Sequence, residues 1–273
     1  MKHIIKSYLK FLWNSKNEHG VHSPFVYDLI TKCFHDTTNY PEYEILKNYR
    51  NSLLENKNTI EVTDFGAGSR VFKSNTREIA KIAKTAGITS KNAKLLFRIV
   101  RYFQPEQILE IGTSLGLASS ALSLGNKNSY LLSLEGCKNT QCVTENLFNT
   151  EFPDYNFEFL NVEFGEFLKH NTGISDWSLI YFDGNHSKKA TLEYFELLLP
   201  TFSNDSVWIF DDIHWSAEMD EAWEIIKNHS KVTVTIDTFQ WGIVFFRKEQ
   251  KKEHFIINPN KTLSSFIFKK IRI

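Results

Sequence analysis

The fold is decided by the stretch Gln107-Ile-Leu-Glu110-Ile-Gly112-Thr-Ser-Leu-Gly116-Leu-Ala-Ser-Ser-Ala-Leu-Ser-Leu124. Three of its first five residues are apolar, which predicts a buried strand, and the apolar spacing of residues 117–124 predicts a helix. Two glycines separate these elements. A glycine turn between a buried strand and a helix can bring its backbone close to a nucleotide-like ligand. The stretch therefore predicts an α/β unit that binds such a ligand.

Short apolar runs alternate with amphipathic segments along the chain that follows. The predicted strands are 130–134, 157–161, 179–182, 207–210, 232–236 and 242–246, and the predicted helices are 140–149, 165–170, 188–199 and 217–229. This alternation is typical of a parallel sheet covered by helices. The last two strands are joined by too few residues for a parallel crossover, so they should form an antiparallel hairpin. We expect a Rossmann-like, seven-stranded, mostly parallel sheet with an antiparallel last strand.

The chain divides into three expected parts. Residues 1–75 have apolar positions at helical spacing and should form a helical N-terminal cap or lid, in which Ser23 caps a helix that starts at Pro24. Residues 76–248 form the α/β domain, whose first long helix we expect Ser90 to cap. Residues 249–273 form a basic tail. Lysines beside the apolar face of the first helix leave two interpretations open, packing on the body or contact with a membrane surface or partner.

Composition narrows the classes of partner. The 273 residues hold 32 basic and 32 acidic side chains, so no global field would attract nucleic acid, and a small-molecule partner is expected. Three cysteines are too few and too uneven for a disulfide scaffold or a zinc set, which fits a reducing compartment. No apolar run is long enough to span a membrane, and the N-terminus does not resemble a signal peptide. We expect a cytoplasmic protein, and a homodimer stays open.

A second glycine-rich segment, Asp64-Phe-Gly-Ala-Gly68, competes with the first. A helical pattern of roughly thirty residues follows it without a predicted strand, so it lacks a following acid for ribose hydroxyls. We expect either a tight turn or a loop over the active site there. The segment at Gly112 has such an acid, because the next predicted strand delivers Glu135 about 25 residues after Glu110.

The spacing of the two glycines in the deciding stretch is G-x-x-x-G and not G-x-G-x-x-G, which disfavours NAD or FAD. Residues 90–247 resemble the class I S-adenosylmethionine-dependent methyltransferases, whose first motif is a strand ending in an acid followed by such glycines. The resemblance makes residues 76–248 the methyltransferase domain. The residues it assigns to the cofactor are Glu110, Gly112, Thr113, Ser114, Gly116, Glu135, Glu163 and Asp183.

The resemblance also implies a role for each of these residues. The glycines would let the loop approach S-adenosylmethionine, with Thr113 and Ser114 at its amino-acid end. Glu110 would orient the loop or the ammonium group of the cofactor. Glu135 would hold the ribose hydroxyls, and Glu163 would lie at the edge of the adenine.

Polar clusters follow the fourth and fifth predicted strands, at Asp183-Gly-Asn-His186 and Asp211-Asp212-Ile-His214. The carboxyl ends of neighbouring parallel strands meet at one edge of the sheet, where ligands bind in open α/β folds. Three carboxylates gathered there would repel one another unless they share a proton, pair with cations or bind a divalent metal.

This cluster is similar to that of small-molecule O-methyltransferases of the catechol and caffeoyl-CoA type and of bacterial relatives with an I-D-G-x-H motif. The resemblance implies that Asp183, Asp211 and Asp212 hold Mg²⁺ or Ca²⁺. His186 takes the place of a lysine base, and an Asp-Asp pair replaces Asp-Asn. Histidine can accept a hydroxyl proton near neutral pH. Asp183 could instead contact the methionine end of the cofactor, and His186 could be an exposed turn residue.

The expected function is methyl transfer from S-adenosylmethionine to a hydroxyl oxygen of a small molecule, with a divalent metal assisting as in the metal-dependent relatives. The alternatives are a non-catalytic S-adenosylmethionine-binding protein and a nucleic-acid methyltransferase. The latter is disfavoured because the fourth strand lacks the N/D-P-P-Y/F motif of base-amine methylation and because the net charge is zero. A dinucleotide oxidoreductase is disfavoured by the glycine spacing.

Overall fold

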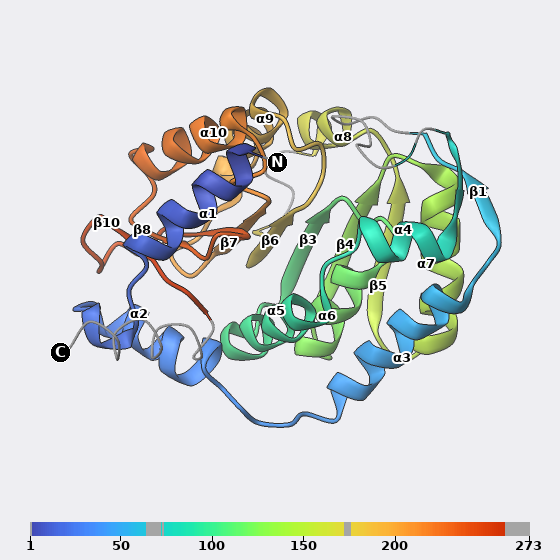
Figure 1. The fold of residues 1–273 in the computed structure, drawn as a ribbon, viewed down its shortest axis with the longest axis horizontal. Coiled ribbons are helices and arrows are strands. Elements are labelled where there is room, and N and C mark those ends of the chain that lie inside the picture. The colour runs from blue at the N-terminus through green and yellow to red at the C-terminus, as the bar shows by residue number, and fades with distance from the viewer. Residues whose placement is uncertain (1, 64–71, 73, 172–175, 260–273) are drawn as a thin grey trace.

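The computed structural model describes residues 2–63, 72, 74–171 and 176–259 (Figure 1). Its centre is an eight-stranded sheet with the strand order β10-β8-β9-β7-β6-β3-β4-β5. Its strands are β3 (Gln107–Ile111), β4 (Tyr130–Glu135), β5 (Asn156–Asn161), β6 (Leu179–Phe182), β7 (Val207–Asp211), β8 (Val234–Asp237), β9 (Trp241–Phe245) and β10 (Glu253–Ile256). Only β9 runs antiparallel to its neighbours in this sheet. The predicted Rossmann-like class and the antiparallel hairpin are confirmed.

The sheet has eight strands and not the predicted seven. The additional strand, β10, comes from the segment predicted to be a tail, and it pairs in parallel with β8 at the edge of the sheet. Its residues Glu253 and His254 are exposed, whereas Phe255 is buried. A short edge strand with one apolar position gives a weak alternating pattern, which explains why the sequence prediction missed it.

Helices cover both faces of the sheet (Figure 1). Side chains alternate along each strand, so Ile108 and Leu131 join the apolar core on one face while Leu109 and Leu132 join the core on the other. The first core is closed mainly by α3 (Glu42–Glu55), α4 (Ile79–Thr85), α5 (Ser90–Phe103), α6 (Leu117–Gly125) and α7 (Lys138–Glu151). The second is closed by α8 (Phe164–His170), α9 (Lys188–Leu198) and α10 (Ala217–Asn228), with the single turn η3 (Leu199–Thr201) after α9.

The N-terminal residues form helices, as expected. They are α1 (Lys2–Asn14), the short turn η1 (Glu18–Gly20), α2 (Pro24–Leu29) and η2 (Ile30–Phe34). The side chain of Ser23 accepts a hydrogen bond from the backbone of Val26, which confirms the predicted cap. Thr89, and not Ser90, caps α5, because its hydroxyl accepts the Asn92 N–H and Ser90 already lies inside the helix.

A small two-stranded sheet follows α3. Strand β1 (Thr59–Glu61) pairs antiparallel with β2 (Thr76–Glu78). A strand therefore does follow the second glycine-rich segment, contrary to our expectation, although its three residues are too short to give a recognisable pattern. Residues 64–68 themselves lie outside the described residues. Within the described ranges, no helix combines the length and apolar character that crossing a bilayer requires.

Candidate active site

The glycine turn after β3 has a backbone that other residues would strain. Gly112 has φ of +100° and Gly116 has φ of +73°, both in the left-handed region that favours glycine. A Cβ on Gly112 would lie 2.6 Å from the carbonyl oxygen of Asp183, so the turn passes directly beside the end of β6. The N–H groups of Gly112 and Thr113 both donate to the carbonyl of Leu134 at the end of β4. The turn is therefore fixed between the ends of β6 and β4.

Glu135 is the last residue of β4 and contacts this turn. Its Oε2 accepts a hydrogen bond from the Ser114 N–H at 2.8 Å, and its Oε1 accepts one from the Cys137 N–H at 2.9 Å. The Glu135 side chain is half-buried. The structure thus brings the two sequence-predicted cofactor groups, the glycine turn and the acid of the next strand, into direct contact.

Glu110 lies beneath the turn and is fully buried. The hydroxyls of Ser119 and Ser133 both donate to its Oε2. Burial raises the pKa of Glu110 to about 8, although these hydroxyl contacts act in the opposite direction. The carboxyl group of Glu110 is therefore mostly protonated at neutral pH and ties the strand to α6 and β4. The two serines were not singled out in the sequence, because buried serines have no characteristic spacing.

Asp183 and Asp211 meet at the neighbouring ends of β6 and β7, as the strand order predicts. The His186 side chain turns back toward them, with its Nε2 3.4 Å from Oδ1 of Asp183. One ligand atom from each of Asp183, His186 and Asp211 lies within 4.8 Å of the others. We refer to these three residues as the acid–histidine cluster.

The electrostatics of the acid–histidine cluster favour a bound positive charge. Burial raises the pKa of Asp183, and burial together with the charge of Asp183 raises the pKa of Asp211 further. Burial alone would lower the pKa of His186, but the contact with Asp183 and the nearby carboxylates raise it to about 9. The imidazolium of His186 thus balances part of the negative charge at neutral pH.

Asp212 is held differently from Asp211. Its backbone has φ of +52°, and its Oδ1 accepts a hydrogen bond from Gln240 Nε2 at 2.6 Å. The same amide nitrogen donates to Asp211 Oδ1 at 2.9 Å. Burial, followed by the charge of Asp211, raises the pKa of Asp212 to about 6. Gln240 was not identified from the sequence, because no sequence pattern indicates that the turn between β8 and β9 lies beside the end of β7.

Glu163 lies just after β5, next along the sheet from β4. Its exposed carboxylate caps α8 by accepting the Glu166 N–H at 2.7 Å. The neighbouring Val162 N–H donates to the carbonyl of Glu135. The structure therefore places Glu163 at the same edge of the sheet as Glu135, where it already forms a helix cap.

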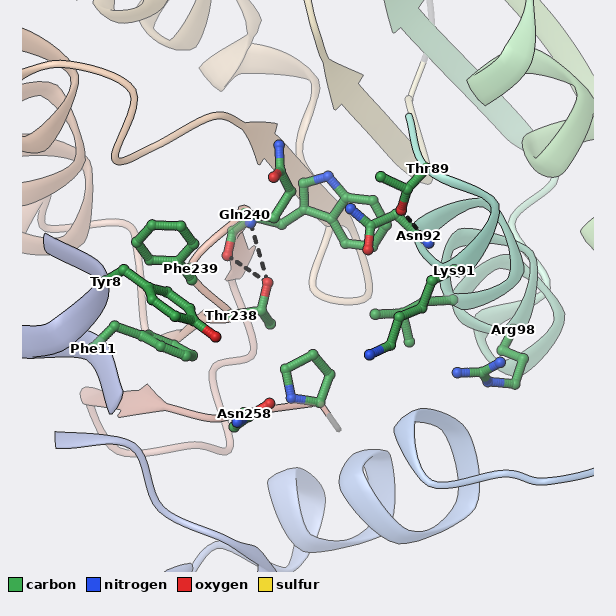
Figure 2. Close-up of a pocket in the computed structure, with 13 residues that line it drawn as sticks. Tyr8, Phe11, Thr89, Lys91, Asn92, Arg98, Thr238, Phe239, Gln240 and Asn258 are labelled. Carbon is green, nitrogen blue, oxygen red and sulfur yellow. Dashed lines mark hydrogen bonds between the residues drawn. The ribbon is translucent and has the colours of Figure 1, made fainter. Parts of the chain in front are cut away.

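A cavity of about 230 Å³ is lined by side chains of α1, of α5 and of the segment that joins β8 to β9 (Figure 2). Gln240 lines it and links it to Asp211 and Asp212. Figure 2 shows the rings of Tyr8, Phe11 and Phe239 on one side and Lys91 on the other, with its ammonium end directed into the space between them. The Tyr8 and Phe239 ring centres are 4.8 Å apart, so α1 supplies part of the wall.

His214 fixes the turn that carries Phe239 and Gln240. Its Nε2 lies 2.9 Å from Oδ2 of Asp237, and its Nδ1 is hydrogen-bonded to Asp220 on α10. Its ring also stacks on Phe239. His214 thus positions one wall of the cavity and does not join the acid–histidine cluster.

Comparison with known proteins finds similarity in sequence to part of the chain and in fold to most of it. Residues 109–213 match the family model described as a methyltransferase domain. A search of curated proteins gave no match. Among solved structures, an S-adenosylhomocysteine-bound methyltransferase from Podospora anserina aligns with a TM-score of 0.59 at 12% identity, over 84% of this chain and 97% of that one.

Two other solved structures have the same fold. An O-methyltransferase from Bacillus cereus in complex with S-adenosylhomocysteine has a TM-score of 0.54 at 15% identity, over 78% of this chain and 93% of that one. The O-methyltransferase TomG from Streptomyces achromogenes has a TM-score of 0.51 at 17% identity, over 59% of this chain and 82% of that one. At these identities the likeness shows the fold.

Proposed function

We propose that this chain transfers a methyl group from S-adenosylmethionine to a hydroxyl oxygen of a small molecule. The match of residues 109–213 to a methyltransferase domain supports the proposal. The observation that carries the proposal is the position of the acid–histidine cluster. Asp183 follows β6 directly and abuts Gly112 of the cofactor turn, so the groups that would activate an acceptor lie beside the turn that would hold the methyl donor.

The residues around the turn fit S-adenosylmethionine. A carboxylate can accept about four hydrogen bonds, so we assign Glu135 to the ribose hydroxyls in addition to its contacts with the Ser114 and Cys137 N–H groups. Gly112 and Gly116 leave the backbone open to close approach, and Thr113 and Ser114 lie at the end assigned to the amino-acid part. Glu163 is assigned to the adenine edge. When bound, S-adenosylmethionine supplies an electrophilic methyl group on a sulfonium.

His186 could take the proton of the acceptor hydroxyl only in its neutral form, and with a pKa of about 9 that form is the minor one at neutral pH. Its ring nitrogen is within reach of Asp183, which orients the imidazole and stabilises its charged form. Asp183 thus supports the base from one side. Because Asp211 is buried and Asp183 and His186 are half-buried, these charges act through less water than at the surface, and their effect on a developing oxyanion is stronger.

The donor set fits a divalent cation. Asp183 and Asp211 offer carboxylate oxygens, the ligands that Mg²⁺ and Ca²⁺ prefer, and the crowding of these carboxylates is relieved by a positive charge. A metal ion there would lower the pKa of an acceptor hydroxyl and displace the proton of His186. Asp212 shares the Gln240 amide with Asp211 and is the third candidate ligand.

The cavity beside Gln240 supports a small acceptor. Aromatic rings form one wall, which suits a planar molecule, and the Lys91 ammonium on the other side suits an acceptor with negative charge. Gln240 lines this space and donates hydrogen bonds to Asp211 and Asp212, so its side chain joins the cavity wall to the acid–histidine cluster.

The direct test is a methyl-transfer assay with radiolabelled S-adenosylmethionine. The acceptors would be an aromatic compound with two adjacent hydroxyls, the same ring with one hydroxyl, and the same ring with an amine, each with Mg²⁺, Ca²⁺ or a chelator. We expect label on oxygen of the dihydroxy compound and a loss of about tenfold or more with the chelator, as for removal of a Lewis acid. Label only on nitrogen, or on none of the hydroxyl compounds, would contradict the proposal.

A further inference from the structure

The first helix, α1, is anchored to the body by one side only. His3 Nε2 lies 3.1 Å from Oδ2 of Asp220 on α10, and the buried ring of Phe11 packs against Phe239 at 5.5 Å between centres. Ser7, one turn from each of these residues, contacts the same Asp220 carboxylate. Residues 3, 7 and 11 therefore form the inner row of the helix, which Figure 1 shows on the outside of the fold near β8 and α10.

The opposite side of α1 carries large apolar side chains in solvent. Ile5 is 59% exposed, Leu9 62% and Trp13 89%. These residues are each two positions after the inner row, which places them about 200° around the helix from it. Of the seven large hydrophobic side chains that are exposed in the described part of the chain, these three form the row, and a fourth residue of α1, Tyr8, packs on Phe239. Because exposed apolar groups in a continuous row mark interaction sites, this row requires a partner.

Basic residues flank the apolar row. Lys6 and Lys10 are exposed, and in the described part of the chain no carboxylate forms an ion pair with either. The first acidic residue of the sequence is Glu18, which lies beyond the end of the helix. The outer side of α1 is thus apolar along its centre and positive along one edge.

We propose that α1 docks this protein on an anionic lipid surface, with Ile5, Leu9 and Trp13 inserted at the boundary of headgroups and acyl chains. Lysine beside leucine and tryptophan on a helix of high amphipathicity is characteristic of helices that lie in a membrane interface. Lysine is depleted in protein–protein interfaces, so the two exposed lysines favour lipid over a second copy of the chain. The inner row stays on the body, so docking requires no detachment of α1.

The test is co-sedimentation of the full chain with vesicles of phosphatidylcholine alone and of equal parts phosphatidylcholine and phosphatidylglycerol. We expect binding to the mixed vesicles that falls as salt rises, and little binding to phosphatidylcholine alone. Replacing Lys6 and Lys10 by glutamine should weaken binding about fivefold for each lysine. The double variant Leu9→Gln/Trp13→Gln should weaken it at least as much.

The control is Ile225→Gln, which removes an exposed apolar side chain from α10 and should leave vesicle binding unchanged. All variants should keep wild-type affinity for S-adenosylhomocysteine, because none of these residues lines the cavity or the glycine turn. Equal binding to both vesicle types would overturn the proposal. So would absence of binding, or a dimer that the Leu9→Gln/Trp13→Gln variant dissociates in sedimentation experiments without lipid.

Discussion

The carboxylate of Glu135 accepts a hydrogen bond from the Ser114 N–H at 2.8 Å, across the ends of two neighbouring parallel strands. The contact joins the acid at the end of β4 to the glycine turn after β3. It fixes the carboxylate beside the backbone that would approach the cofactor. The carboxylate of Glu135 is therefore already in position before any ligand binds, which lowers the entropy cost of ordering this side chain on binding.

Replacing Glu135 by alanine should weaken binding of S-adenosylhomocysteine about 10- to 100-fold. The substitution removes a charged acceptor for ribose hydroxyls and releases Ser114, and hydrogen bonds to charged groups contribute about 1.5–3 kcal/mol each. Isothermal titration calorimetry measures the effect. Glu151→Ala, which removes an exposed acid from the end of α7, should bind as wild type. Unchanged affinity in Glu135→Ala would show that the cofactor binds elsewhere.

Replacing Asp211 by asparagine should leave the affinity for S-adenosylhomocysteine within about twofold of wild type and reduce turnover by about 100-fold or more, as for removal of one preorganised charged group at an active site. The amide keeps the shape of the side chain but removes its charge from the acid–histidine cluster. Activity and any heat of Mg²⁺ or Ca²⁺ binding should be lost together. Asp205→Asn removes an exposed acid and serves as the control. Full turnover in Asp211→Asn contradicts this assignment.

Replacing Gly112 by alanine should destabilise the fold and prevent cofactor binding. The positive φ costs about 1–2 kcal/mol for a residue with a Cβ, and that Cβ would lie 2.6 Å from the Asp183 carbonyl oxygen. Gly20→Ala is the matched control, because its Cβ would meet only the Lys16 side chain at 3.4 Å. Chemical denaturation and calorimetry give the two readouts. A Gly112→Ala protein with wild-type stability and affinity would exclude the described turn.

Glu110 predicts a specific dependence of stability on pH. Its pKa is about 8 in the folded protein against an ordinary value of 4.5, so the folded state binds more protons between these values. The free energy of unfolding should therefore fall as pH rises from about 4.5 to about 8. The Glu110→Gln variant has no carboxyl group to titrate, so its free energy of unfolding should not show this fall. At about pH 8 it should exceed the free energy of unfolding of wild type by a few kcal/mol, because each pKa unit corresponds to about 1.4 kcal/mol.

Urea denaturation of wild type and Glu110→Gln at about pH 5 and about pH 8 checks this expectation. The exposed Glu151→Gln should follow the wild-type curve. If wild type and Glu110→Gln lose stability in parallel between the two pH values, the buried carboxyl group is not protonated in the folded state.

Much of the sheet could be predicted because its strands are buried and end at recognisable turns. The run before Gly112 is buried on both faces, as a central parallel strand requires, and β4 ends at the predicted acid Glu135. The same logic placed Asp183 and Asp211 at adjacent strand ends, since parallel strands in this order share one edge of the sheet.

Other features depend on contacts between distant residues and have no local pattern. Gln240 reaches Asp211 and Asp212 only because β9 pairs with β7. The structure groups His186 with Asp183 and Asp211, where the sequence predicted Asp212, and no local pattern reports which of the two side chains lies there. The cap of α5 was misplaced by one residue because Thr89 and Ser90 both have hydroxyls suited to capping.

The central claim is that the turn from Gly112 to Gly116 binds S-adenosylmethionine, and calorimetric titration of the purified chain with S-adenosylhomocysteine tests it most directly. We expect saturable binding with a dissociation constant on the order of micromolar, which corresponds to a binding free energy of about −8 kcal/mol. We expect no heat of binding with NAD. Absence of binding, or binding of NAD alone, would contradict the claim.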